Sequence, residues 1–322
     1  MKVPRRPGVY PKWSRSWKAT RSNLVKWRDI HGPDTTKELD HYARHGRRAT
    51  PGHVMRGNPP YRSWENNQLD MDLHLLGLLR VFELEQRGMA GEAFDSTLAM
   101  HAFAAVYTSQ VIALEFHNQA PARFGGTQSS GLETDAIPFT ALGLVAGCRA
   151  EALKLGRAQT AAYRKGWYQN DTADFPIFIF ILRMLAAYLE EPAIRLNRAA
   201  AHPILTALFD LRRAPGTEEL QQVCLAACDL HTHQYKPGGE FEHIAIWART
   251  PIEILLLFKL RQLAGLPNPQ LDHPLMNTPL GQLPQEVTFA PDELVTRVRA
   301  RMTKSGYDEA AILAKAIKPL KR

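Results

Sequence analysis

Apolar residues recur at helical spacing through most of the chain, and the clearest run lies between Thr250 and Pro284. Leucine, isoleucine and phenylalanine occupy nearly every side of that helix, which is typical of a helix buried inside a larger helical body. Thr250 is predicted to cap the start of the helix, with Glu253 reaching back to the cap. Gly265 is predicted to end it, and the prolines that follow indicate an irregular tail.

Other apolar patterns repeat with helical periodicity between short links of glycine, proline and polar residues. We find neither the alternation of apolar and polar residues that predicts strands nor the turn pairs of β-hairpins. The sequence predicts an all-α protein of stacked antiparallel helical hairpins, with an irregular basic N-terminal extension. Two short helices are predicted within that extension, over residues 22–30 and 35–44. The remaining predicted helices cover residues 64–86, 90–116, 136–155, 159–169, 175–189, 203–212, 218–230, 241–248, 291–302 and 307–316.

Charge divides the chain into three segments. Residues 1–65 form a basic extension with a net charge of +10, and this extension contains four tryptophans and several prolines. Residues 66–291 form a helical body with a net charge of −6, and residues 292–322 form short helices and a basic tail with a net charge of +4. The total of +8 therefore does not describe a uniformly basic fold.

The basic extension has two interpretations. Interleaved aromatic and cationic side chains bind nucleic acid in some proteins by stacking on bases and contacting phosphates, and Arg47 and Arg48 are the candidate contacts here. The interpretation we favour is that the extension lies over the acidic body, with its tryptophans in surface grooves. A nucleic-acid contact is recognised by a steep loss of binding as the salt concentration rises, and by its loss when these arginines are replaced.

Signals for membranes or export are weak in this sequence. The basic N-terminus is followed by no apolar segment, and no run approaches the ~20 apolar residues that span a bilayer. The three cysteines, Cys148, Cys224 and Cys228, lie in helical patterns and are predicted to be buried free thiols, which suits a reducing compartment. We therefore expect a cytoplasmic protein without membrane contact.

Five possible metal ligands gather around a Gly-Gly turn: His231, His233, Glu240, Glu242 and His243. Imidazole and carboxylate groups suit zinc, manganese or iron. Their spacing matches no motif with a known mechanism, such as His-Glu-x-x-His, so a polar loop between helices is the favoured interpretation. We assign no catalytic residue, cofactor or metal. A metal-dependent hydrolase at His231, His233 and His243 stays an alternative.

Acidic residues lie beside predicted loops and at the ends of the central helices. Glu133 and Asp135 follow a polar loop over 118–132, and Asp171 and Asp174 precede the most apolar of the predicted helices. Loops of this length often carry function. The acidic residues are consistent with a protein-binding face, although a solvated surface is the commoner explanation for any one of them.

Two portions of the chain combine helix ends and polar turns in a similar way. In residues 144–192, a Gly-x-x-x-Glu-Ala helix end is followed by a polar gap and an apolar helix that closes in an acidic turn. In residues 250–284, a leucine-rich helix is followed by a tail interrupted by prolines. The residues concerned are Gly147, Glu151, Ala152, Pro251, Ala264, Gly265, Leu266, Asp272, His273, Pro274 and Leu275.

These portions, about a quarter of the chain, resemble cytosolic immunity proteins of bacterial polymorphic-toxin systems, of the all-helical kind that includes the immunity protein 49 family. The resemblance implies a non-enzymatic inhibitor that binds a cognate toxin and blocks its active site, and it transfers no catalytic residues. We therefore predict a protein-binding immunity protein. A nucleic-acid-associated protein that uses residues 1–65, or the metal-dependent hydrolase, is the alternative.

Overall fold

The computed structural model describes residues 4–50, 62–119, 132, 134–168, 175–195, 201–234, 239 and 245–319. These residues form an all-helical fold, in which the only β-type pairing is an isolated parallel bridge between Leu132 and Tyr168. The predicted fold class is confirmed. The α-helices are α1 (Trp13–His45), α2 (Arg62–Met89), α3 (Ser96–Gln119), α4 (Ile137–Ala146), α5 (Arg149–Arg164), α6 (Pro176–Tyr188), α7 (Pro203–Asp210), α8 (Glu218–His233), α9 (Ile252–Leu263), α10 (Glu293–Lys304) and α11 (Glu309–Ile317).

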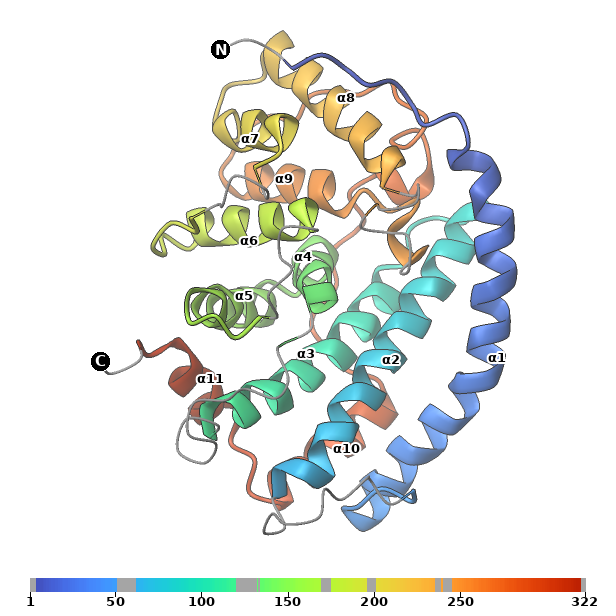
Figure 1. Cartoon of the computed structure of the whole chain (residues 1–322), viewed down its shortest axis with the longest axis vertical. Helices are drawn as coiled ribbons and strands as arrows, with labels where there is room; N and C mark the ends of the chain where they lie inside the picture. Colours follow the sequence, from blue (N-terminus) through green and yellow to red (C-terminus); the bar gives the residue numbers. More distant parts are fainter. Residues whose placement is uncertain are drawn as a thin grey trace.

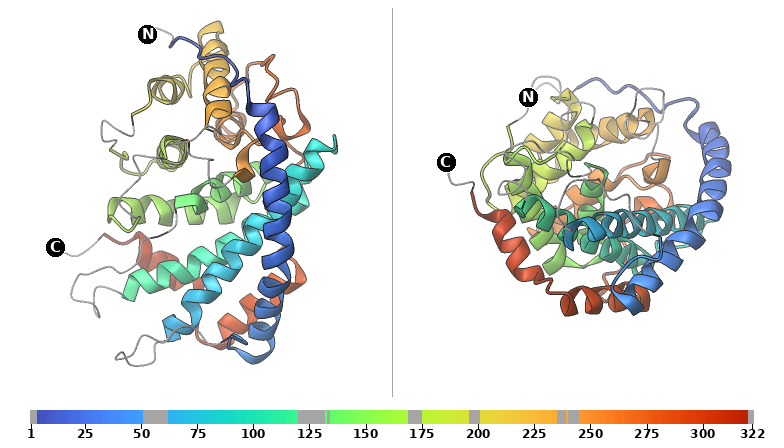
Figure 2. Two further views of the ribbon diagram at one scale, coloured as in Figure 1. Left: turned by 45° about the vertical axis from the view of Figure 1, so that its right-hand side comes forward. Right: turned by 60° about the horizontal axis from the view of Figure 1, so that its bottom comes forward.

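The helices are arranged around the long pair α2 and α3, which crosses the molecule diagonally (Figure 1). α1 runs along one side of this pair, and α10 packs against both α1 and α3. α4 packs on α3 and connects it to α5, α6 and α9, while α7 and α8 pack on each other. α11 returns to α3 and α5, so the helices nearest the two ends of the chain both close against the central pair (Figure 2).

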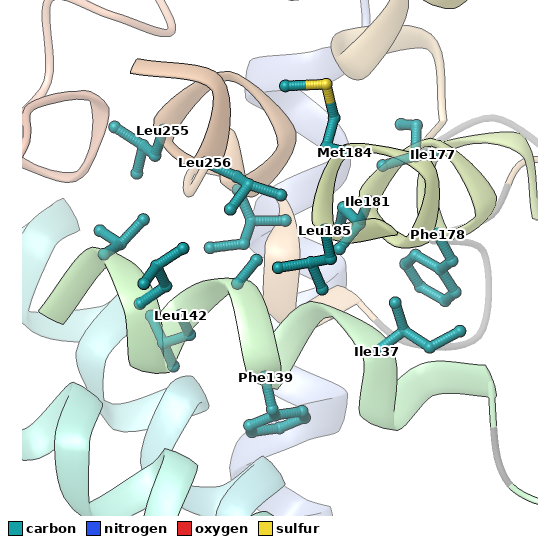
Figure 3. Close-up of a cluster of buried hydrophobic side chains, with 14 of the residues drawn as sticks. Ile137, Phe139, Leu142, Ile177, Phe178, Ile181, Met184, Leu185, Leu255 and Leu256 are labelled. Atoms are coloured by element: carbon teal, nitrogen blue, oxygen red, sulfur yellow. The ribbon is translucent and has the colours of Figure 1, made fainter. Parts of the chain in front are cut away.

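The apolar core is centred where α4, α6 and α9 meet (Figure 3). Phe139 and Leu142 project from α4, Leu185 from α6 and Leu256 from α9, and all four side chains are fully buried. A helix with neighbours on several sides needs apolar residues on all of them. The apolar composition of the Thr250 region therefore predicts the central position of α9 correctly.

A second, smaller core joins the two ends of the chain. Leu39 and Tyr42 of α1 are buried with Val295, Val298 and Met302 of α10. Leucines of α2 complete this cluster. The basic N-terminal segment and the basic C-terminal segment are therefore held together by apolar side chains beneath their charged surface.

The N-terminal extension is more regular than its composition indicates. The sequence predicts an irregular extension with two short helices over 22–30 and 35–44, whereas residues 13–45 form one helix of 33 residues. Pro33 lies inside this helix, although proline removes a backbone N–H and crowds the preceding turn. The prediction is wrong because packing against α2 and α10 outweighs the local preference.

Two glycines explain errors in the other predicted helix boundaries. One helix is predicted over 136–155, but Gly147 has a φ of +105° and separates α4 from α5. A Cβ at Gly147 would also lie 2.7 Å from the Cβ of Glu286, so the close approach of the tail requires glycine there. The helix predicted over 64–86 stops short of Gly88, which lies inside α2. A Cβ at Gly88 would lie 2.3 Å from Cγ of Leu280, so close packing explains this glycine.

α3 is long and apolar enough, by length and composition, to cross a bilayer, and it is the one helix of the described ranges that meets this criterion. The sequence patterns predict no segment of this kind, so α3 is more apolar than that prediction states. The most apolar stretch of α3 is 78% buried inside the protein, against α2, α4 and α11. The core position of α3 therefore accounts for its composition.

Candidate functional site

A fully buried ion pair lies at the junction of α8 and α9. Nδ1 of His231 lies 2.8 Å from Oε1 of Glu253, and Nε2 of His231 lies 2.8 Å from the carbonyl oxygen of Trp247. Both partners accept hydrogen bonds, so the ring donates from both nitrogens and is positively charged. Burial is the largest single effect and disfavours this charge, but attraction to the Glu253 carboxylate and the hydrogen bonds to Glu253 and Trp247 together outweigh burial and raise the pKa of His231.

A second buried carboxylate, Glu85 on α2, holds the start of α9. It accepts hydrogen bonds from the backbone N–H groups of Arg249 and Thr250 at 3.1 and 2.9 Å, and from the Thr250 hydroxyl at 2.7 Å. The predicted capping arrangement is therefore wrong, because Thr250 donates to Glu85 and Glu253 contacts His231. Burial raises the pKa of Glu85 to about 7, although these hydrogen bonds act in the opposite direction.

A third buried carboxylate, Asp229 on α8, binds the beginning of the described chain. Residues 4–12, here called the N-terminal strap, lie along α8 (Figure 1). Nε of Arg6 lies 2.8 Å from Oδ2 of Asp229, and Nε2 of His273 lies 3.1 Å from Oδ1. Burial alone would raise the pKa of Asp229, but the hydrogen bonds from Arg6 and His273 lower it overall.

Further contacts fix the strap and the start of α1. The backbone N–H of Tyr10 donates to Oγ1 of Thr232 at 2.9 Å. Trp13 is 5% exposed, and the guanidinium of Arg249 lies 4.2 Å from the centroid of its ring. The favoured interpretation of the basic extension, in which it lies over the acidic body with a tryptophan in a groove, is thereby confirmed for Arg6 and Trp13.

The predicted metal ligands do not converge in the part of the chain that the structure describes. Both nitrogens of His231 are already bonded inside the core, whereas Nε2 of His233 lies 2.9 Å from the carbonyl oxygen of Gly8 in the strap. Within the described ranges, no three His, Cys, Asp or Glu side chains are placed to hold a metal ion. Three further candidates lie outside the described residues: Glu240, Glu242 and His243.

The predicted partner-binding residues divide into paired and exposed groups. Nε of Arg48 lies 2.8 Å from Oδ2 of Asp72, and Nε2 of His74 lies 3.1 Å from Oδ2 of Asp135. Arg48 therefore belongs to an internal ion pair and Asp135 contacts His74, while the Arg47 side chain is exposed. Three of the predicted acidic residues lie outside the described residues: Glu133, Asp171 and Asp174.

The three cysteines are free and buried, as their helical context predicts. Burial raises the pKa of the Cys148 thiol to about 12 and raises that of Cys228 well above its usual range. A protonated, enclosed thiol is a poor nucleophile, because the thiolate is the reactive form. These side chains therefore contribute packing rather than reactivity.

An open cleft of about 390 Å³ lies between the C-terminal end of α3 and the turn that joins α10 to α11. Gly306 has a φ of +90°, which allows the chain to turn sharply there. Asp308 then accepts a hydrogen bond from the backbone N–H of Ala311 at 3.0 Å and starts α11. Acidic, amide, phenol and ammonium groups surround the cleft, contributed by Glu115, Gln119, Tyr307, Asp308 and Lys315.

Sequence patterns do not identify this cleft, because its walls come from opposite halves of the chain. Glu115 lies near the end of the predicted helix over 90–116, Gln119 lies in the predicted loop over 118–132, and Lys315 belongs to a short basic segment. That loop and the glycine at position 306 are the local signals. Only the packing of α11 on α3 brings these side chains together.

Comparisons with known proteins assign no family to this chain. No family model, no curated protein and no solved structure matches it. The resemblance to immunity proteins therefore stays an expectation drawn from the residues alone.

Proposed function

We propose that this chain is a protein-binding protein that neutralises a cognate toxin by covering the active site of the toxin. The cleft between α3 and α11 receives part of the toxin in this proposal. The main observation in favour of a binding protein is the position of His231. The sequence offers this residue as a metal ligand of a possible hydrolase. The side chain is 0% exposed and bonded at both nitrogens, so it joins α8 to α9 and has no atom left for a substrate.

The cleft suits a segment of another protein. A volume of about 390 Å³ is within the range of binding pockets and accommodates a few side chains. Lys315 is exposed, and Glu115 and Asp308 bring carboxylates close to it, so the cleft offers both signs of charge. Charge complementarity of this kind speeds association and selects the partner.

The framework around the cleft supports tight binding. α11 is held on α3 beside the cleft, because Nδ2 of Asn118 donates to the carbonyl oxygen of Ile312 at 3.0 Å and the hydroxyl of Tyr107 donates to Oε1 of Glu309 at 2.6 Å. A framework that is ordered before binding loses less conformational entropy when the complex forms. The proposal includes a cytoplasmic location, where such an inhibitor protects the cell that makes it.

The test begins with the tagged full-length chain purified from its native cells after nuclease treatment and in high salt. Mass spectrometry then identifies any partner present in equal amount. That partner is expressed in a susceptible host, with and without this chain. We expect the partner to be toxic alone and harmless with the chain, and its purified activity to be blocked in the complex.

Two charge reversals connect this result to the cleft. Lys315→Glu changes a residue that lines the cleft, whereas Lys37→Glu makes the same change on the exposed side of α1. We expect Lys315→Glu to weaken the complex by about tenfold or more and Lys37→Glu to leave it unchanged. A partner that is harmless alone, or equally toxic with the chain, contradicts the proposal. Recovery of nucleic acid in place of a protein assigns the function to the basic extension.

A further inference from the structure

Two arginines share one aromatic ring at the junction of α6 and α7, which lie next to each other in Figure 1. Cζ of Arg183 on α6 lies 4.0 Å from the centroid of the Phe209 ring on α7. Cζ of Arg212, just beyond α7, lies 3.9 Å from the same centroid. The two guanidinium carbons are therefore no more than about 8 Å apart.

The position of each guanidinium is set by contacts that leave most of its N–H donors without a hydrogen bond to the described residues. The face of the Phe209 ring attracts both cations, and Nη1 of Arg212 donates to the carbonyl oxygen of Phe209 at 2.7 Å. Phe209 itself packs against the apolar core, so the ring is a fixed platform. Neither arginine forms an ion pair with a carboxylate of the described residues.

This cluster carries excess positive charge in a partly buried place. Burial lowers the pKa of Arg183 and of Arg212; a neighbouring arginine lowers each further, while Asp210 acts in the opposite direction on both. Two like charges at this separation repel each other, and the ring compensates only in part. A negatively charged group placed between or beside them removes this repulsion and accepts their free N–H donors.

We propose that Arg183 and Arg212 form a binding site for a carboxylate side chain of the partner protein. This inference deepens the proposed function and rests on it for the partner. The planar fork of a guanidinium presents paired N–H donors that match the two oxygens of a carboxylate. Stacking on Phe209 holds both forks in place before the partner arrives.

The surroundings favour a single carboxylate over a polyanion. Asp210 lies close enough to both arginines to favour their charged forms, and its side chain is exposed. A nucleic-acid backbone that reached both arginines would bring further phosphates close to Asp210. One aspartate or glutamate side chain reaches the arginines without that repulsion.

The test measures binding of a fluorescently labelled, C-terminally amidated peptide with one glutamate among glycine and serine residues to the full-length protein at low ionic strength by fluorescence anisotropy. We expect Arg183→Gln and Arg212→Gln each to weaken binding about tenfold, which corresponds to one lost charge-assisted contact. Arg195→Gln removes the same charge from an exposed position between α6 and α7 and is the matched control. We expect it to leave binding within twofold of the unchanged protein.

Further measurements keep the result decisive. Circular dichroism checks that each variant is folded. If a glutamine variant does not fold, Arg183→Lys and Arg212→Lys keep the charge, lose the planar fork, and are expected to weaken peptide binding. Absence of peptide binding by the unchanged protein, or an equal loss in Arg195→Gln, overturns the inference. So does tighter binding of a single-stranded DNA hexamer that is lost in the same variants.

The peptide measurement uses no toxin, so it fails or succeeds independently of the proposed function. A protein that neutralises its toxin but does not bind the peptide loses only the carboxylate site. A protein that binds the peptide through these arginines but neutralises no toxin keeps the site and loses the proposed partner class.

Discussion

The α8–α9 junction and the α6–α7 junction both hold positive charge in partly apolar surroundings, but they compensate for it differently. At α8–α9, the His231 ring lies 2.8 Å from a carboxylate oxygen of Glu253. At α6–α7, the guanidinium groups of Arg183 and Arg212 lie against one phenylalanine ring and form no ion pair with a described carboxylate.

This difference separates charges that stabilise the fold from charges that are available to a partner. A buried charge with one matched partner becomes strongly unfavourable when that partner is removed. A cation held on an aromatic face contributes little to stability and keeps donors for another molecule. Changes at the first junction are therefore expected to act on folding, and changes at the second on binding.

The largest effect is expected for Glu253→Gln. This change keeps the shape of the side chain but removes the negative charge that faces His231, whose side chain is fully buried. We expect a loss of about 3–5 kcal/mol in the free energy of unfolding, measured by urea denaturation. Combining it with His231→Gln is expected to cost less than the sum of the two single changes, because both remove the same interaction.

A matched control is Glu293→Gln on α10, whose side chain is 89% exposed. Its effect on the free energy of unfolding is expected to stay within about 0.5 kcal/mol. Equal effects of Glu253→Gln and Glu293→Gln would show that the buried His231–Glu253 pair does not stabilise the fold through its charges. The proposed difference between the two junctions would then be wrong.

The next largest effect concerns pH and Glu85. Burial raises the pKa of this carboxyl from 4.5 to about 7 in the folded protein, so unfolding releases a proton between these pH values. The stability that Glu85 contributes is present below pH 4.5 and is lost as the pH rises to about 7. The difference in unfolding free energy between the unchanged protein and Glu85→Gln is expected to fall by about 3 kcal/mol over this window.

The unchanged protein has to be compared with a variant, because His117 also changes the pH dependence of the unfolding free energy. Burial lowers its pKa to about 4, so its contribution is present above pH 6.5 and is lost as the pH falls. Glu85 makes the unfolding free energy fall as the pH rises, and His117 makes it rise. In the unchanged protein the two contributions partly cancel. His117→Gln is therefore expected to steepen the decline with rising pH, and Glu85→Gln to reverse it. A pH-independent difference for either variant contradicts its assigned pKa shift.

Features that depend on local pattern are predictable from this sequence, and features that depend on distant contacts are not. The helical periodicity predicts the fold class and the buried setting of α9, whose apolar residues face neighbours on several sides. The role of Thr250 is predicted wrongly, because its hydrogen-bond partner Glu85 lies 165 positions away. Pro33 likewise gives a local signal for interruption that tertiary packing overrides.

The candidate sites follow the same rule. The sequence brings His231 and His233 together as possible ligands, but two positions apart on α8 they point to opposite sides of the helix, to Glu253 and to the strap. The cleft and the Phe209 cluster each need two helices to be packed before they exist. Residues spaced regularly along one helix are visible in a sequence, whereas side chains that meet between helices are not.

A smaller effect is expected at Glu190, which lies just beyond the C-terminal end of α6. Its φ of +56° is the one positive φ among non-glycine residues of the described chain. The backbone N–H of Glu191 bonds to the carbonyl oxygen of Ala186 at 2.9 Å, an arrangement that usually places glycine at position 190. Glu190→Gly is expected to raise the free energy of unfolding by about 0.5–1 kcal/mol.

Glu190→Ala separates backbone strain from charge at this position. Alanine removes the carboxylate but keeps the Cβ that disfavours a positive φ, so no comparable gain in thermal stability is expected. A gain of equal size in both variants would assign the effect to the lost negative charge.

The smallest effect on stability is expected for Arg183→Gln, and this result sharpens the comparison most directly. The variant loses one contact with the Phe209 ring and the attraction to Asp210, but it also removes the cost of burying the charge and the repulsion from Arg212, and these contributions oppose each other. We expect the free energy of unfolding to stay within about 0.5 kcal/mol of the unchanged protein, while peptide binding falls. A loss above about 2 kcal/mol would instead make Arg183 a structural residue of the α6–α7 junction, equivalent in kind to Glu253.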